Sequence, residues 1–423
     1  MNEVNVETAA KVTKPKYDGR IKKRQWEDAN ESDESKKART EPRVKRRKSI
    51  ILMGYSGINY YGMQRNPEMK TIEEDLLTAL LKAKLITDEA FAQVQTIQFQ
   101  RAARTDKGVS AARQVVSLKL PDEAEPSAIN EHLPEDIRVF AVKRVTKGFN
   151  SKSQCDARTY TYTLPTVAFA NHDEVHDSSN YRINNNKMEQ VRKILKYYEG
   201  SKNFHNFTSR KDFYDPSSRR FIVSCTCLEP FISRNMEFAV ISIKGQSFML
   251  HQIRKMVGLA LAIIRGHTTE ETLEKAWTES RLDIPMAPGL GLVLDRVHYD
   301  KYNTRYGLDG IHEILTWEKE EEEIKQFTHK YIYEKIIETE VNEKCIVSWL
   351  ETLPLHSYDV RDEGAEQSLK NLRDLRENLA LQLSHLQALC EKLYMIRTRY
   401  LKIQEQLWLL DHNAILNQSL IGI

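Results

Sequence analysis

Hydrophobic positions between residues 48 and 300 follow two different periods that alternate along the chain. Continuous apolar runs such as residues 50–53 predict buried strands, and apolar residues spaced three to four apart in residues 71–81 predict a helix. Thr71, with Glu74 three residues later, has the pattern of a capping box, so this helix should begin there. Further strands are predicted at residues 96–101, 114–120, 138–145, 158–164, 221–227, 237–244 and 290–297, and further helices at 125–132, 185–198 and 247–265.

This mixture predicts an α+β fold, because several neighbouring strands are hairpin-like and do not alternate regularly with helices. A polar stretch at residues 171–180 marks the boundary between an N-terminal half, 48–170, and a C-terminal half, 171–355. We therefore expect two α+β halves within the folded region.

The N-terminal arm, residues 1–47, is polar, charged and poor in aromatic residues. It cannot bury enough apolar surface to order itself, so we expect it to be disordered. Two basic clusters, Lys22–Arg24 and Lys45–Lys48, fall in this region. Such clusters act as nuclear-import signals or bind phosphate groups, and two of them in one arm favour a nuclear location over a plain solvated tail.

The last segment, residues 356–423, has a seven-residue period. Large apolar residues recur every seventh position from Leu372 to Leu407, and a second set starting at Leu375 follows three positions behind. This pattern predicts a coiled coil through residues 365–411, which could form a homo-oligomer or bind a helical partner. A single amphipathic helix packed on the body of the protein is the alternative.

Charge and cysteine content narrow the class of protein. The net charge is +3, but residues 1–48 hold 15 of the 63 basic and 9 of the 60 acidic residues, so the remainder is slightly acidic. An RNA-binding site in the folded part would therefore need a local basic cleft. The five cysteines are scattered, which argues against disulfides and a zinc site. No apolar run is long enough to predict a membrane span, and no secretion signal is recognisable.

The densest group of reactive side chains lies at residues 101–111, between two predicted strands. Asp106 stands there at a loop tip between Arg104 and Lys107, and Gly108 permits a tight turn. Nearby positive charge favours an ionised carboxylate, which can act as a nucleophile or a base. An aspartate in this setting is also a common turn residue, so the segment alone leaves both interpretations open.

A second candidate segment is the strand predicted at residues 158–164. Alternation along a strand puts Tyr160 and Tyr162 on one face, with Arg158 beside them. Aromatic side chains on a strand can stack on nucleic-acid bases, although ordinary packing within a sheet gives the same pattern.

A third candidate segment is the helix predicted at residues 247–265. His251, Arg254 and Lys255 are three to four residues apart and should share one helix face. This face could contact nucleic acid, or it could be a solvated basic stripe.

Taken together, the three segments resemble the TruA family of tRNA pseudouridine synthases, because their motifs occur in that family in the same order. The motifs are RTDxGVxA at residues 104–111, ARxYxY at 157–162 and FxxHxxRxxVG at 248–258. Residues 62–66, 149–150 and 203–207 resemble the eukaryotic nuclear branch of the family. The resemblance spans about residues 48–355 and excludes both terminal segments.

The resemblance implies roles for four residues. Asp106 would be the catalytic nucleophile, and Arg254 would pair with it across the cleft. Arg104 would fill the gap left by the extruded uridine, and Tyr160 would stack on the target base and relay the proton from C5. The family fold, two α+β halves joined by a central antiparallel sheet with RNA in the groove between them, is expected here too.

The resemblance further implies isomerisation of uridine to pseudouridine in tRNA, in the anticodon stem region, with small nuclear RNA or mRNA as further substrates. The remaining candidate RNA contacts are Arg158, Tyr162, His251 and Lys255. The reaction imports no group and oxidises nothing, so neither a cofactor nor a metal is expected. Whether the carboxylate attacks C1′ or removes the 2′ proton to give a glycal stays open.

Two other functions compete with this interpretation. A non-catalytic RNA-binding protein could use the same scaffold, but it would tolerate the loss of Asp106, which this chain keeps together with its neighbours. A glycoside-type hydrolase usually needs two carboxylates flanking the bond, and these motifs have no second acid beside Asp106.

Overall fold

The computed structural model describes residues 45–174, 177–209 and 211–360. Its central feature is a ten-stranded sheet in the order β4-β1-β3-β10-β5-β9-β7-β6, with β2 paired to β3 and β8 paired to β9 at its sides. The strands are β1 (Arg46–Tyr55), β2 (Gln100–Arg101), β3 (Ser110–Pro121), β4 (Ile137–Arg144), β5 (Ala157–Pro165), β6 (Gly200–Asn203), β7 (Arg219–Cys227), β8 (Phe231–Ser233), β9 (Met236–Gly245) and β10 (Leu292–His298).

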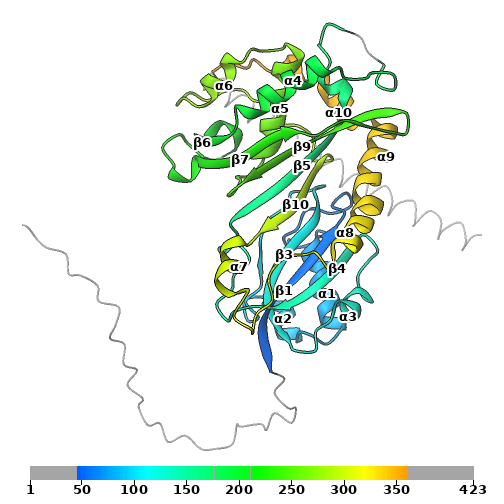
Figure 1. Cartoon of the computed structure of the whole chain (residues 1–423), viewed down its shortest axis with the longest axis vertical. Coiled ribbons are helices and arrows are strands. Elements are labelled where there is room, and N and C mark those ends of the chain that lie inside the picture. Colours follow the sequence, from blue (N-terminus) through cyan, green and yellow to red (C-terminus); the bar gives the residue numbers. More distant parts are fainter. Residues whose placement is uncertain (1–44, 175–176, 210, 361–423) are drawn as a thin grey trace, which may run out of the picture. The chain divides into compact units, whose positions relative to one another are not determined.

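Helices cover both ends of this sheet (Figure 1). Near β1 and β4 lie α1 (Ile72–Lys82), α2 (Asp88–Ala92) and α3 (Pro126–Asn130). The helices near β7 and β9 are α4 (Asn185–Lys196), α5 (Gln252–Arg265), α6 (Glu271–Ala276) and α10 (Cys345–Leu350). The remaining helical segments are α7 (Asp300–Tyr306), α8 (Glu321–Phe327), α9 (Glu334–Glu343), the π-helical η4 (Thr328–Tyr333), and the short η1 (Thr166–Phe169), η2 (His205–Phe207), η3 (Pro216–Ser218) and η5 (Leu353–Leu355).

The predicted α+β class is confirmed, and one sheet contains the strands of both predicted halves. The link is β10, a strand from the C-terminal half that lies between β3 and β5 of the N-terminal half. It pairs antiparallel with β5 and parallel with β3. The other strand pairs of the described sheet are antiparallel, so the sheet is mostly antiparallel. A long-range pairing of this kind has no local signal in the sequence.

The strand and helix predictions hold where the local pattern is strong. Ile50, Ile51 and Leu52 in β1 are fully buried, and burying each such side chain contributes roughly 1.5–3 kcal/mol. The α1 helix begins where predicted, because the Thr71 hydroxyl accepts a hydrogen bond from the Glu74 amide. The strand expected at residues 96–101 is reduced to β2, since residues 94–98 form turns.

One stretch that the sequence did not reveal runs from α8 through η4 to α9. It contacts β1 and β3 through η4. Arg113 of β3 also forms an ion pair with Glu321 of α8 at 2.9 Å, which attaches this stretch to the sheet. The same guanidinium pairs with Asp295 of β10 at 3.1 Å. Arg113 therefore links three elements that are far apart in the sequence.

The predicted extent of the N-terminal arm is wrong at its end, because β1 already begins at Arg46. Lys48 is buried, and its ammonium group donates to the carbonyl of Gln98 at 2.8 Å. Burial lowers the pKa of Lys48 to about 8. The second basic cluster is therefore partly built into the sheet, and an import signal in the arm would rest on Lys22–Arg24, which lies outside the described residues.

The heptad segment at residues 365–411 also lies outside the described residues. Residues 356–360, assigned above to that segment, instead pack on the folded body: His356 contacts Asp283 at 2.9 Å, and Val360 forms a bridge with Leu282. Within the part of the chain that the structure describes, no helix has the length and apolarity needed to span a membrane.

Candidate active site

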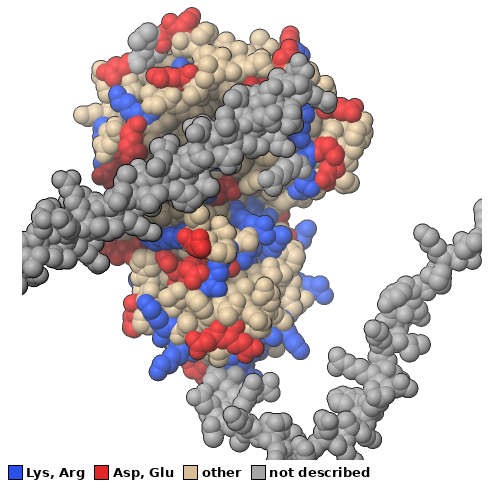
Figure 2. Space-filling model, turned by 180° about the vertical axis from the view of Figure 1, so that it is seen from behind, with Lys and Arg blue, Asp and Glu red and all other residues tan. Residues whose placement is uncertain are grey.

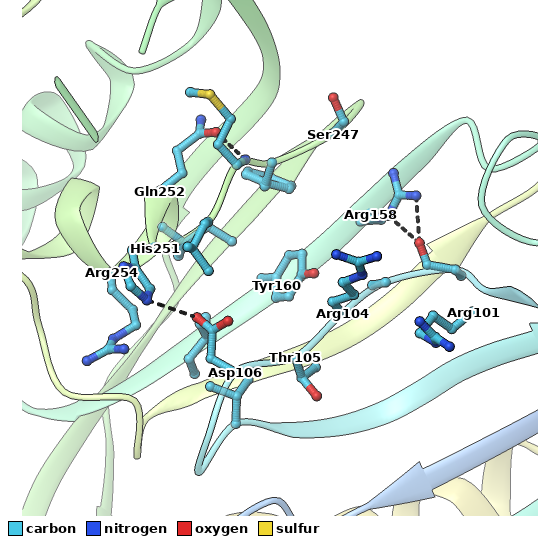
Figure 3. A pocket seen from close by; sticks show the side chains of 18 of the residues that line it. Arg101, Arg104, Thr105, Asp106, Arg158, Tyr160, Ser247, His251, Gln252 and Arg254 are labelled. Atoms are coloured by element: carbon cyan, nitrogen blue, oxygen red, sulfur yellow. Dashed lines mark hydrogen bonds and ion pairs between the residues drawn. The ribbon is translucent and has the colours of Figure 1, made fainter. Parts of the chain in front are cut away.

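A pocket of about 540 Å³ lies where the loop between β2 and β3, strand β5 and the start of α5 meet. Figure 3 shows that Arg104 and Asp106, from the loop between β2 and β3, come together in it with Tyr160 of β5. The predicted site residues that line it are Arg104, Asp106, Arg158, Tyr160, His251 and Arg254. Tyr162 and Lys255 are not among its lining residues.

The loop that carries Asp106 is held from inside the N-terminal half. The phenol of Tyr55 lies 2.8 Å from the Thr105 hydroxyl, and both groups are buried. The side-chain amide of Gln114 donates to the Ala103 carbonyl at 2.9 Å and accepts from the Ala103 amide at 3.2 Å. These buried hydrogen bonds fix the backbone on the N-terminal side of Asp106, because breaking them would leave polar groups unpaired away from water.

Two glycines let the loop at residues 57–63 approach the segment that carries Asp106 closely. Gly62 has a φ of +100°, and a Cβ there would stand 2.7 Å from the Thr105 carbonyl. Gly57 lies so close to Val109 that a Cβ would meet its carbonyl oxygen at 2.1 Å. The close fit is completed by hydrogen bonds from the Met63 amide to Thr105 and from the Gly108 amide to Tyr60. Only residues without a side chain fit at positions 57 and 62.

The side chain of Asp106 is 28 % exposed, and among the described residues its ionisable partner within 4 Å is the imidazole of His251, at 3.8 Å between Oδ2 and Nε2. The sequence-based prediction that His251 lies on the α5 helix face is wrong. The helix starts at Gln252, and His251 precedes it in a left-handed conformation with a φ of 62°. This uncommon backbone, which the sequence pattern does not reveal, turns the imidazole toward Asp106 (Figure 3).

Arg254 lines the pocket, but it does not pair with Asp106 as expected. Among the described residues no ion pair within 4 Å joins the two side chains. The Arg254 Nε instead donates to the carbonyl of Ala287 at 2.7 Å. Burial lowers the pKa of Arg254, and Tyr162 and Asp106 act in the opposite direction. The guanidinium thus contributes positive potential near Asp106 without touching it.

Tyr160 is buried against the pocket wall, with its ring edge-to-face with that of Phe248 at 5.3 Å between centroids. Burial raises the pKa of its phenol well above the ordinary value, so the group stays protonated at neutral pH. Tyr162 is fully buried, and its hydroxyl donates to the carbonyl of Pro288 at 2.8 Å. Tyr162 therefore packs inside the protein and does not line the pocket, which is the ordinary role of a strand residue in a sheet.

Some basic side chains in and near the pocket already make hydrogen bonds or ion pairs with the protein, and others are available to a ligand. Arg158 is buried and gives its donors to the backbone, with bonds of 3.1 and 2.7 Å to Ala102 and 3.0 Å to Gln246. Arg101, which the sequence did not single out, pairs with Glu73 at 2.8 Å. Arg104 is exposed and has no hydrogen-bond or ion-pair partner among the described residues. Lys255 points elsewhere and donates to the Asn206 carbonyl at 3.1 Å.

The pocket is strongly cationic within a protein of mixed surface charge. Basic and acidic side chains are interspersed over the face seen in Figure 2, with a local group of basic ones. Among the described residues Asp106 is the only carboxylate that lines the pocket, against six Lys and Arg residues. No group of three or more His, Cys, Asp or Glu side chains suited to a metal ion occurs in the described ranges. Lining residues that the sequence analysis missed as site residues are Arg101, Lys152, Arg220, Phe248 and Gln252.

The pocket holds one carboxylate among several cations and is lined by residues of strands near the middle of the sheet. A site of this class suits a polyanionic substrate. Comparison with known proteins identifies that class further. The family model described as tRNA pseudouridine synthase matches residues 176–300. The mouse protein named pseudouridylate synthase 1 homolog is 51 % identical over 328 residues, covering 76 % of this chain and 77 % of the mouse protein.

Two further relatives agree with these matches. The human pseudouridylate synthase 1 homolog is 51 % identical, covering 73 % of each chain. The tRNA pseudouridine synthase 1 of Kluyveromyces lactis is 34 % identical, covering 78 % of this chain and 74 % of the yeast protein. The chain belongs to the TruA-type tRNA pseudouridine synthases, a family of isomerases.

Proposed function

We propose that the protein converts uridine to pseudouridine in tRNA, with Asp106 as the nucleophile that acts on a flipped-out uridine. The observation that carries the proposal is that Asp106 is the one carboxylate among the described residues lining a pocket with six Lys and Arg side chains. The family of the chain and the names of its relatives support the reaction and the tRNA substrate.

The chemistry matches the groups available. The N1–C1′ bond of uridine breaks, the uracil turns, and a C5–C1′ bond forms, while a proton leaves C5 and another is gained at N1. In the nucleophilic route the Asp106 carboxylate bonds to C1′ and leaves when C5 attacks. In the glycal route it takes the 2′ proton, so a 2′-deuterium isotope effect on turnover distinguishes the two routes.

The target must be extruded from structured RNA, which costs a few kcal/mol. Arg104 is exposed beside Asp106 and is unpaired among the described residues, so it can fill the vacated place. Tyr160 and Phe248 offer an apolar wall for the extruded base. Such contacts offset the cost of flipping.

The direct test is tritium release from tRNA that carries 5-tritiated uridine, with the purified chain as the only protein. Release with wild type supports the proposal, and tRNA binding without release would favour the non-catalytic alternative. The absence of a second acidic lining residue among those described weighs against a glycoside-type hydrolase.

We further propose that the protein acts on uridines in the anticodon stem region of tRNA, and on small nuclear RNA and mRNA as further substrates. We also propose a nuclear location, and self-association or binding of a helical partner through residues 365–411. Pseudouridine mapping in cells that lack the gene, rescued with wild type or with Asp106→Ala, tests the substrates. Sedimentation of the chain with and without residues 356–423 tests the oligomeric state.

We expect Tyr160→Phe to lose most of its turnover while the protein stays folded. The phenol is protonated at neutral pH and can pass on a proton, and a proton-transfer group is commonly worth about 10² to 10⁴ in rate. The ring contact with Phe248 survives in this variant. Single-turnover rates measure the effect. Wild-type rates in Tyr160→Phe would exclude a proton relay, and a loss found only in Tyr160→Leu would indicate stacking.

We expect the wild-type rate to fall on acidification as His251 becomes charged. Burial lowers the pKa of this imidazole below its ordinary 6.5, with Arg254 and Lys255 lowering it further and Asp106 opposing them. The imidazole is therefore neutral at pH 7, and at lower pH its charged form competes with substrate for the Asp106 carboxylate. Rates measured from pH 5 to 8 should show that His251→Asn lacks this loss, and identical profiles would contradict it.

A further inference from the structure

The positive charge in the pocket extends well beyond the catalytic carboxylate. In Figure 3 Asp106, His251 and Arg254 lie toward one end, Tyr160 lies between, and Arg158 and Ser247 lie toward the other end. Lys152 and Arg220 also line the pocket. Arg158 lies near both residues: its guanidinium is 3.5 Å from the Lys152 carbonyl. The pKa of Arg220 is lowered by burial and, to a smaller extent, by the positive charge of Arg158.

Most of the cations in the pocket are already committed to the protein. Arg158 is bonded to backbone carbonyls, Arg101 is paired with Glu73, and Arg254 donates to Ala287. In the described part of the chain Lys152 and Arg220, by contrast, have no side-chain hydrogen bond and no ion pair within 4 Å.

Arg220 is the more informative of the two free cations. Its Nε is buried and has no hydrogen-bond partner among the residues that the structure describes, which is a costly state for a charged donor unless a ligand supplies an acceptor. Asp215 is near enough to favour the charge of Arg220, but its carboxylate is already bonded to Lys211 and Ser217. Lys152 is exposed and free to move toward a shared anion.

We propose that Arg220 and Lys152 together bind one backbone phosphate of the RNA strand next to the flipped uridine, at the end of the pocket away from Asp106. This inference rests on the proposed function only for the RNA substrate, not for the chemistry. A phosphate there supplies acceptors to both free cations and fixes the direction in which the strand leaves the pocket. Arg220 and Lys152 are thus positioning residues, not catalytic ones.

The first test compares tRNA binding by the full chain and its Arg220→Ala and Lys152→Ala variants at several salt concentrations. Each variant should bind roughly tenfold more weakly, the loss expected for one charge-assisted contact. The slope of log Kd against log salt should fall by about 0.7 to 1 for the lost phosphate contact. Arg219→Ala is the matched control, because Arg219 precedes Arg220 on β7, is exposed, and lines a different hollow.

The second test removes the charge from the RNA. An RNA stem-loop is made with a single neutral methylphosphonate at each phosphate near the target uridine in turn. At one position the methylphosphonate should weaken wild type but leave Arg220→Ala unaffected, and Arg220→Lys should restore part of the discrimination. The proposal is overturned if, at every position, the methylphosphonate weakens binding by Arg220→Ala as much as it weakens binding by wild type. It is also overturned if Arg219→Ala weakens tRNA binding as much as Arg220→Ala does.

These readouts separate failure of this inference from failure of the proposed function. Binding is measured independently of turnover, so the phosphate site stands or falls even if the chain proves inactive. Thermal unfolding of Arg220→Ala checks for misfolding. If that variant is unstable, Lys152→Ala decides with the same methylphosphonate series, because an exposed lysine can be truncated without disturbing the fold.

Discussion

An Asp106→Asn variant is expected to bind tRNA with nearly wild-type affinity and to release no tritium from 5-tritiated uridine. The amide has the shape of the carboxylate but is neither a nucleophile nor a base, so turnover should fall by at least about a thousandfold, as when other catalytic nucleophiles are removed. The fold should be unaffected, because among the described residues the Asp106 side chain has no partner closer than His251 at 3.8 Å. Tritium release and filter binding on the same tRNA measure the two effects.

A matched control for this substitution is Asp122→Asn. Asp122 is a surface aspartate that pairs with Arg47 at 3.1 Å and does not line the pocket. The Asp122→Asn variant should fold normally and retain full activity, since exposed ion pairs contribute little to stability. Residual turnover above about one per cent of wild type in Asp106→Asn would remove Asp106 from the nucleophile role. Equal loss in both variants would point to a general effect on folding or charge.

The second large effect is expected from Gly57→Ala, a substitution outside the pocket. The added Cβ would meet the Val109 carbonyl oxygen at 2.1 Å and the Val109 amide nitrogen at 2.9 Å. Both are backbone atoms, so the loop that carries Asp106 must itself move. Overpacking of this kind costs about 1–3 kcal/mol of unfolding free energy. A shift of about 1 Å in Asp106 can lower the rate on the order of a hundredfold.

Gly148→Ala is the control for this prediction, because a Cβ at position 148 would have no atom of the described residues within 4 Å. Thermal unfolding and turnover should both be near wild type in that variant. If Gly57→Ala kept the wild-type melting temperature and rate, the loop at residues 57–63 would not be what holds Asp106 in place. A lower melting temperature with an unchanged rate would show that the loop recovers its position.

Much of the fold could be predicted from local pattern alone. The apolar run of β1 and the Thr71 cap of α1 are signals contained within a few residues, and both elements form where expected. The site could be predicted in part, because the motif around Asp106 is also local. The segment from α8 to α9 could not, since its position depends on distant partners such as Arg113.

The sequence by itself determined the alternation of strands and helices, the family, and six of the residues that line the pocket, among them Asp106 and Tyr160. Only the tertiary structure decided how the predicted residues are placed: His251 precedes its helix, Arg254 is bonded to Ala287, and the hydroxyl of Tyr162 is bonded to Pro288 outside the pocket. Periodicity and motif spacing record which residues are near in the chain. Hydrogen-bond partners, burial and free charge depend on contacts between segments such as β3, β5 and α5, which only the folded sheet brings together.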